Sequence, residues 1–294
     1  MKSIKIFISL TISTLLFWSC NNFVTEIDPS ELPSTDSRLV LSCYISPQDT
    51  VIAAKLTETK TVLSTGGTRA DITNATMKIS DGTKTVTMVY SNSLLYYRAL
   101  PAQMPIVVGK TYTMTVSTPD GRSVSSKCTV PQPVTIKEIK VDSGTSVTIR
   151  RLNAQEVKEY YLKLIWQDLP GAGNYYRGFG FVQGTFKDRN NVITQRTEGV
   201  DFTGLDDKNS DGQLLTLNVI YQPSRNSISA TIQKLTVGLF HADVNYFNYH
   251  ESLRKQRGSN NNPFVEPVLL YTNVEGGFGC FGAYNAAWQE LKVK

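Results

Sequence analysis

The sequence begins with a basic and then an apolar segment, and most of the remaining chain alternates between apolar and polar residues. Lys2 and Lys5 precede an uncharged run of 13 residues, 6–18. This order is typical of a secretory signal, and the run is shorter than the roughly 20 apolar residues of a transmembrane helix. Cys20 follows a small residue, so residues 1–19 are predicted to be a lipoprotein signal peptide and Cys20 the lipidated first residue. The alternative is an ordinary secreted protein with a cysteine near its start.

The segment that begins at Cys20 is polar and shows no periodicity. Residues 20–37 include Pro29 and Pro33 and no regular apolar spacing. Such a composition predicts a flexible tether, which would hold the folded part away from a lipid surface.

Residues 38–131 alternate with a period of two, which is typical of strands that bury one face. Short runs at this spacing, separated by glycine turns, predict an immunoglobulin-like β-sandwich. Asp81 and Gly82 are the residue pair that a two-residue hairpin turn favours. With such a turn, Met77 is expected to lie opposite Val86.

A second hairpin is predicted around Pro119, Asp120 and Gly121. A three-residue loop places Val116 opposite Val124, whereas a loop of two or four residues would pair inward with outward positions. This loop also needs Gly121 in the left-handed conformation.

Three cysteines follow Cys20 in the chain. Cys43 and Cys128 lie on the apolar faces of the first and last predicted strands of the sandwich, so both thiols are expected to point into its core. They form either a disulfide or two free, buried thiols, and the sequence leaves both alternatives open. Cys280 is expected to be a core residue.

The prolines within residues 131–136 predict a domain boundary, because proline interrupts a strand ladder. Residues 132–294 are expected to form a larger β-rich domain with one short helix. Strands are predicted there over residues 159–167, 177–186, 213–222 and 227–243.

Two local irregularities are expected in this second part. The apolar positions change phase at Gln233 and Lys234, which predicts a β-bulge. The spacing of Tyr246, Tyr249 and Leu253 predicts a helix over residues 245–256, with aromatic residues on one face.

The charge balance limits the classes of partner. The chain has 30 basic and 25 acidic residues, a net charge of +5, which falls to +3 when the signal takes away Lys2 and Lys5. This small excess without a long basic block predicts no nucleic-acid partner. His241 and His250 are the only histidines in the chain. A histidine-based metal site or catalytic triad is therefore not expected.

One acidic segment resembles a metal loop. Asp207, Asn209 and Asp211, followed by Gly212, match the first half of a calcium loop. The twelfth position is Asn218, where such a loop has a bidentate glutamate. The same residue types form polar hairpin tips. A turn is the favoured interpretation, and weak calcium binding is the alternative; no other cofactor is expected.

Several segments carry a resemblance to a known family. They are LSCYISPQDTV, GKTYTMTVSTPDGRSVSSKCTVPQPVTI, NYYR at residues 174–177, and NPFVEPVLLYTNVEGGFGCFGAYN. Together they resemble the outer-membrane lipoprotein family DUF4249 over nearly the whole mature chain. The most specific part is TNVEGGFGCFGAY, in which Val274 stands where the family usually has isoleucine. The resemblance implies a lipid-anchored outer-membrane protein, often encoded beside TonB-dependent transporters, and provides no catalytic residues.

The expected function is therefore that of a non-catalytic accessory or ligand-binding subunit of a TonB-dependent transporter. The lipid on Cys20 would anchor it in the outer membrane, facing either the periplasm or the cell surface. One alternative is a surface hydrolase that acts on glycans or peptides with two carboxylates about 5 to 10 Å apart in a cleft. Another is a structural adhesin with an open strand edge.

Overall fold

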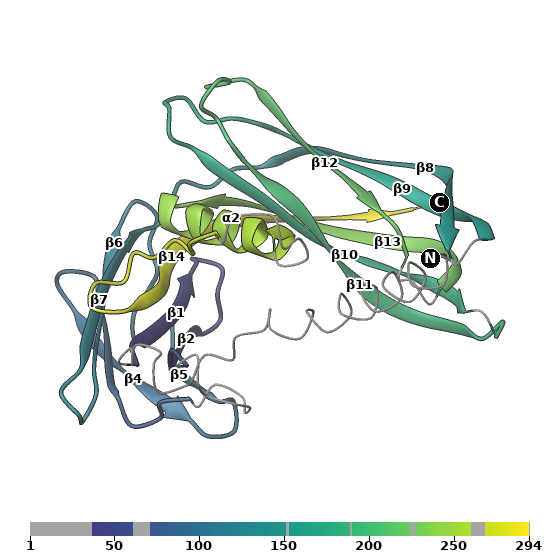
Figure 1. Cartoon of the computed structure of the whole chain (residues 1–294). Helices are drawn as coiled ribbons and strands as arrows, with labels where there is room; N and C mark the ends of the chain where they lie inside the picture. Colours follow the sequence, from purple (N-terminus) through teal and green to yellow (C-terminus); the bar gives the residue numbers. More distant parts are fainter. Residues whose placement is uncertain are drawn as a thin grey trace, which may run out of the picture. The chain divides into compact units, whose positions relative to one another are not determined.

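The computed structural model describes residues 37–60, 71–150, 153–188, 190–223, 227–259 and 268–293. Residues 1–36, which hold the predicted signal, Cys20 and nearly all of the tether, lie outside this described part. The described chain is mostly β, with one helix, α2 (Val244–Ser259), as Figure 1 shows. The predicted all-β fold class is therefore confirmed. Among the described residues, no helix has the length and apolar character needed to cross a bilayer.

The strands divide into those before and those after the prolines near residue 131. The first group is β1 (Leu39–Ile45), β2 (Ile52–Glu58), β3 (Thr76–Ser80), β4 (Thr85–Ser91), β5 (Tyr96–Ala99), β6 (Thr111–Ser117) and β7 (Ser123–Thr129). The second group is β8 (Ile136–Arg150), β9 (Asn153–Gln167), β10 (Tyr175–Asp188), β11 (Ile193–Asp206), β12 (Leu214–Tyr221), β13 (Ser227–Ala242) and β14 (Phe278–Lys292).

Two sheets contain these strands. The larger has the order β11-β10-β13-β14-β1-β2-β5-β4-β3-β6-β7, and the smaller has the order β12-β9-β8. β14 joins the two groups, because residues 278–283 pair in parallel with β1 and residues 284–292 pair antiparallel with β13. The last described strand is thus hydrogen-bonded to the first described strand.

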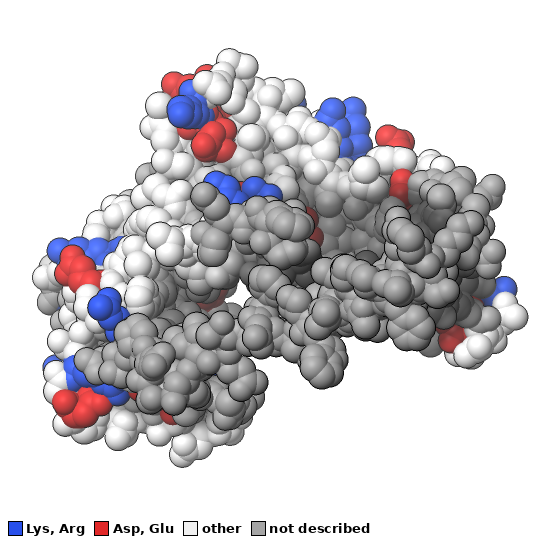
Figure 2. All heavy atoms as spheres, viewed as in Figure 1, with Lys and Arg blue, Asp and Glu red and all other residues white. Residues whose placement is uncertain are grey.

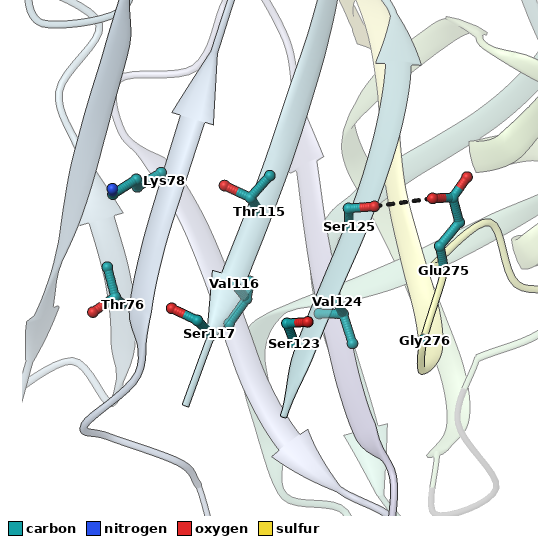
Figure 3. A pocket seen from close by; sticks show the side chains of 10 residues that line it. All are labelled: Thr76, Lys78, Thr115, Val116, Ser117, Ser123, Val124, Ser125, Glu275 and Gly276. Atoms are coloured by element: carbon teal, nitrogen blue, oxygen red, sulfur yellow. Dashed lines mark hydrogen bonds between the residues drawn. The ribbon is translucent and has the colours of Figure 1, made fainter. Parts of the chain in front are cut away.

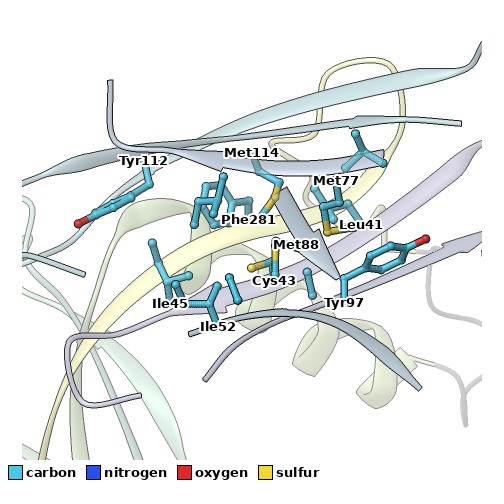
Figure 4. Packing of buried hydrophobic residues seen from close by; sticks show 14 of the residues in the cluster. Leu41, Cys43, Ile45, Ile52, Met77, Met88, Tyr97, Tyr112, Met114 and Phe281 are labelled. Carbon is cyan, nitrogen blue, oxygen red and sulfur yellow. The ribbon is translucent and has the colours of Figure 1, made fainter. Parts of the chain in front are cut away.

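The first core lies among the strands of the first group. β1 alternates buried and partly buried positions, and its buried positions include Leu41, Cys43 and Ile45. Phe281 of β14 is fully buried in the same cluster, as Figure 4 shows. The division into residues 38–131 and 132–294 stays a prediction. The first core nevertheless includes Phe281, which lies in the second of these two ranges.

The described cysteines are buried free thiols. Cys43 and Cys128 both point into the first core, as their strand positions predict, and the structure holds them unbridged. Cys280 is also buried. Burial raises the pKa of all three thiols, which disfavours the reactive thiolate.

The hairpin at Asp81 differs from its predicted register. Met77 pairs with Met88 instead of Val86, and the connection is two residues longer than predicted. The Asp81 carboxylate explains the longer loop, because it accepts hydrogen bonds from the backbone N–H groups of Thr83 and Lys84 at 3.0 and 2.7 Å. A shift of two residues leaves every side chain on its predicted face.

The second hairpin has the predicted register. Val116 pairs with Val124, and Gly121 has φ +88°. The backbone N–H of Thr118 donates to Arg122 O at 2.9 Å, which closes the three-residue loop.

The second core lies between the smaller sheet and strands of the larger one. Its fully buried aromatic side chains include Trp166 of β9 and Tyr176 of β10. The predicted bulge in β13 is confirmed, because Lys234 pairs with Gln183 and Ile232 with Gly184, which leaves Gln233 without a partner position. β8, β11 and β14 were not among the strands expected from the sequence.

The predicted helix is confirmed as α2. Its first turn is capped by Asp243, whose Oδ1 accepts a hydrogen bond from the Tyr246 backbone N–H at 2.8 Å. Tyr246 is buried with 7% exposure, as its position on the predicted aromatic face requires. α2 packs mainly against β14, with further contacts to β10 and β13.

Candidate functional site

The predicted calcium loop forms the turn between β11 and β12. Asp207 and Asp211 lie beside Asp168, which follows β9, and one carboxylate oxygen of each lies within 4.8 Å of the others. Asp168 and Asp207 are buried, with 3% and 1% exposure. Asn209, the third predicted ligand, is exposed. The structure therefore groups two of the predicted residues with one that the loop pattern did not include.

Hydrogen bonds from the backbone hold this acidic cluster. The Gly173 N–H donates to Asp207 Oδ1 at 3.0 Å, and the Gly212 N–H donates to Asp168 Oδ2 at 2.7 Å. Asp211 accepts a third amide N–H from the loop before β10. These hydrogen bonds connect the loop between β9 and β10 with the turn between β11 and β12, as expected of a polar turn. The oxygen-rich group also suits calcium, which stays a prediction.

Tyr176 connects the acidic cluster to the second core. Its hydroxyl donates to Asp168 Oδ1 at 2.6 Å, and its ring stacks on His241 with centroids 5.0 Å apart. His241 Nδ1 lies 2.7 Å from Gln132 O, and burial lowers the pKa of His241. A neutral His241 therefore donates its Nδ1–H to this carbonyl and serves packing.

A hollow of 460 Å³ lies on the outer face of β3, β6 and β7. The register places Lys78, Thr115 and Ser125 in one row across the three strands. Ser125 Oγ donates to Glu275 Oε2 at 3.1 Å, as Figure 3 shows. The hollow thus offers hydroxyl groups between a lysine and a glutamate. The backbone bridge from Ser125 to Glu275 covers this part of the β7 edge, and the adhesin hypothesis stays a prediction.

A second hollow, of 480 Å³, is lined by acidic side chains on strands β9 and β11. Glu159, Glu198 and Asp201 contribute to its wall. The Tyr221 hydroxyl donates to Glu198 Oε2 at 2.7 Å, and the Tyr161 hydroxyl donates to Glu159 Oε2 at 3.2 Å. A hydrolase with paired carboxylates would need acids that face a hollow in this way.

The comparison with known families fits the sequence motifs. The profile of DUF4249, a domain of unknown function, matches residues 22–290. The chain belongs to the DUF4249 family. No curated protein matches it. Family membership is thus established, while the lipid anchor and the outer-membrane location stay predictions.

In this DUF4249 chain, six aromatic side chains share the outer face of β10, β13 and β14, and two of them, Tyr175 and Tyr284, contact α2. The other four are Phe179, Phe181, Phe240 and Trp288, which we call the ring face. Phe181 and Trp288 are 40% and 48% exposed. The alternate positions of the same strands, such as Val182 and Leu239, pack into the second core. The sheet therefore has one face in the core and one aromatic face that solvent reaches.

Charges on the DUF4249 chain are mixed. Figure 2 shows basic and acidic side chains close together on the face that it draws. Several form surface ion pairs, such as Lys234 with Glu290 at 2.7 Å and Arg177 with Asp201 at 2.8 Å. Both of these pairs border the ring face.

The sequence did not single out several of these site residues. Asp168 is far in the sequence from Asp207 and Asp211, so only the fold brings the three carboxylates together. Phe181 and Trp288 lie in strands, where aromatic residues usually serve the core. Tyr160 and Tyr176 do so, with exposures of 3% and 0%, and Tyr246 of α2 is buried too, with 7%.

Proposed function

We propose that this DUF4249 chain is a lipid-anchored, non-catalytic binding subunit that works beside a TonB-dependent transporter in the outer membrane. The observation that supports this best is the ring face. A strand face that exposes Phe181 and Trp288 next to each other costs hydration free energy in an isolated molecule, and such patches mark binding surfaces in soluble proteins.

Each part of the chain has a place in this proposal. The signal architecture supports Cys20 as the anchor, and the polar tether of residues 20–37 gives the folded part reach from the membrane. The strands of the first group would serve as a spacer or docking module. The second group, with its long strands and ring face, would carry the specific surface. Either membrane face is compatible with this arrangement.

A pull-down tests the accessory role. A tag after Lys294 would recover the protein from gently solubilised, mildly crosslinked outer membranes, and mass spectrometry would identify its partners. We expect one large β-barrel transporter to be enriched with the wild type. The matched control is Cys20→Ser, which should lose both the membrane association and the barrel. Recovery of the anchored protein without any barrel would contradict the accessory role.

One observation favours a second candidate, the surface hydrolase. Glu159 and Glu198 both face the second hollow, where each is oriented by a tyrosine hydroxyl. If this candidate is correct, Glu159→Gln and Glu198→Gln should each abolish hydrolysis of a glycan or peptide by the purified protein while leaving its melting temperature nearly unchanged. Tyr221→Phe, which removes only the hydroxyl contact to Glu198, is the control for an indirect effect. Absence of wild-type hydrolysis would exclude the candidate.

A further inference from the structure

The two most exposed rings of the ring face are almost parallel. The planes of Phe181 and Trp288 differ by 16°, and their centroids are 6.3 Å apart. One ring comes from β10 and the other from β14, so they belong to strands on either side of β13. A flat group that lies along one of these rings is therefore nearly parallel to the other ring as well.

The ring of Trp288 lies against the sheet. A Cβ added at Gly238 of β13 would come within 2.9 to 3.0 Å of two Trp288 ring carbons, so glycine at this position lets the indole approach the backbone closely. Since Trp288 is still 48% exposed, much of the indole away from Gly238 is accessible to solvent.

The other two rings hold this pair in place. Phe179 meets Phe181 edge-on at 5.0 Å with an angle of 87°, and Phe240 meets Trp288 at 5.6 Å with an angle of 71°. Such edge-to-face contacts are favoured by the ring quadrupoles. The exposed rings are therefore supported before any ligand arrives, which reduces the entropy that binding would cost.

The border of the ring face is polar, and most of its charges are paired. Thr236 and Glu290 lie in register with Phe181 across the three strands. Glu290 accepts a hydrogen bond from Lys234 at 2.7 Å, while Arg177 pairs with Asp201 beside Phe179. A ligand on the rings would thus meet hydroxyl and carboxylate oxygens and one further base, Lys292, which lies opposite Lys234.

We propose that the ring face binds a neutral polysaccharide, whose pyranose rings lie on Phe181 and Trp288. The C–H groups on one side of a pyranose suit the electron-rich face of an aromatic ring. The hydroxyl groups around its edge can bond to polar border residues such as Thr236 and Glu290. This inference rests on the proposed binding function and names the ligand class for it.

Other occupants fit this surface less well. A lipid bilayer would have to desolvate the Lys234–Glu290 and Arg177–Asp201 pairs, which is costly. Single-stranded nucleic acid can stack on aromatic rings, but its binding grooves also use unpaired basic residues along the backbone. At the ring face, Lys234 and Arg177 already pair with acids, and Lys292 adds a single further base instead of a basic groove.

Tryptophan fluorescence gives a direct test. The chain after Cys20 has two tryptophans, Trp166 and Trp288, and Trp166 is fully buried. Acrylamide quenching of the purified full chain in detergent therefore reports mainly on Trp288. We expect at least one of the neutral hexasaccharides of glucose, xylose or mannose to protect Trp288 from quenching. Phosphatidylglycerol added to the detergent micelles and oligo-dT should give no protection, and sedimentation should show that a second copy does not cover the face.

Variants then assign the binding to the rings. Calorimetric titration of the same hexasaccharide should show an affinity about tenfold lower for Trp288→Ala and for Phe181→Ala. Trp288→Phe should retain most of it. Val89→Ala is the matched control, since Val89 is 67% exposed on β4, outside the ring face, and should bind as the wild type does. Circular dichroism would verify folding, and Phe181→Ala keeps the test valid if Trp288→Ala unfolds.

Specific results would overturn the proposal. These are no protection by any hexasaccharide, equal affinity in Phe181→Ala and the wild type, or protection only by phosphatidylglycerol, nucleic acid or self-association. The titration uses protein separated from any transporter, so its failure leaves the accessory role standing. A pull-down that recovers no barrel, together with intact sugar binding, would overturn the accessory role and leave the polysaccharide proposal standing.

Discussion

At the scale of single residues, His250 has an unusual environment. It lies on α2 against Tyr44 of β1 and Tyr246 of its own helix, with ring centroids 5.3 and 4.3 Å away. Burial lowers its pKa to about 4, and the positive charges of Arg177 and Arg257 add to this, while Glu251 opposes it. His250 is therefore neutral in the folded protein over the physiological range.

This pKa predicts how stability depends on pH. Below pH 6.5 the unfolded chain takes up a proton on His250 while the folded chain does not, so stability falls until the pH reaches about 4. Buried Asp243, with its pKa raised to about 6, acts in the opposite direction, because its folded form keeps a proton that the unfolded form loses. His250→Gln should separate the two effects.

Urea unfolding at pH 7.5 and pH 4.5 measures the difference. The wild type should lose about 2 to 3 kcal/mol relative to His250→Gln between these two pH values. Equal pH dependence in both proteins would show that His250 titrates normally in the folded state.

A second residue-scale prediction concerns the acidic cluster. Asp168→Ala should lower the free energy of unfolding by about 2 to 3 kcal/mol, because the buried Tyr176 hydroxyl and the Gly212 N–H lose their acceptors. Asp211→Ala, at an exposed position, should cost less than about 1 kcal/mol. If hydrogen bonds alone hold the turn, denaturation in calcium and in EDTA will give the same losses. A loss found only in calcium would identify an ion at this site.

At the scale of elements, local chemistry predicted more than long-range pairing. The loop at Gly121 and the bulge at Gln233 follow from side-chain parity within a few residues, and the structure has both. The turn at Asp81 was predicted two residues too short, because the hydrogen bonds of its carboxylate were not considered. The sequence did not predict β11, because several of its successive residues are exposed, including Ile193 at 65%, and it lacks a regular apolar alternation. The parallel pairing of β14 with β1 has no local signal.

The pairing of β14 with β1 predicts a large effect of one core residue. Phe281→Ala should cost about 3 to 5 kcal/mol, because Phe281 is fully buried in the first core. The control is Phe278→Ala in the same strand, where the side chain is 40% exposed and a loss near 1 kcal/mol is expected. Chemical denaturation measures both. Similar small losses would contradict the placement of β14 in the first core.

At the scale of the whole molecule, the sequence predicted the β class and the family but only part of the organisation. Proline and glycine indicate where strands stop, and this can be read from the local sequence without knowledge of distant contacts. Which strands share a core depends on contacts between distant residues, so the contribution of Phe281 to the first core was not predictable. The ring face was missed for a related reason, because period-two patterns do not say which face remains uncovered.

The intact mass of the mature protein tests the central claim most directly, because the compartment and the accessory role both depend on the lipid anchor. The protein would be purified from outer membranes and weighed by mass spectrometry before and after removal of ester-linked acyl chains. The account predicts a chain that begins at Cys20 and carries diacylglycerol on its thiol. A chain that begins elsewhere, or one with an unmodified Cys20, would contradict the account.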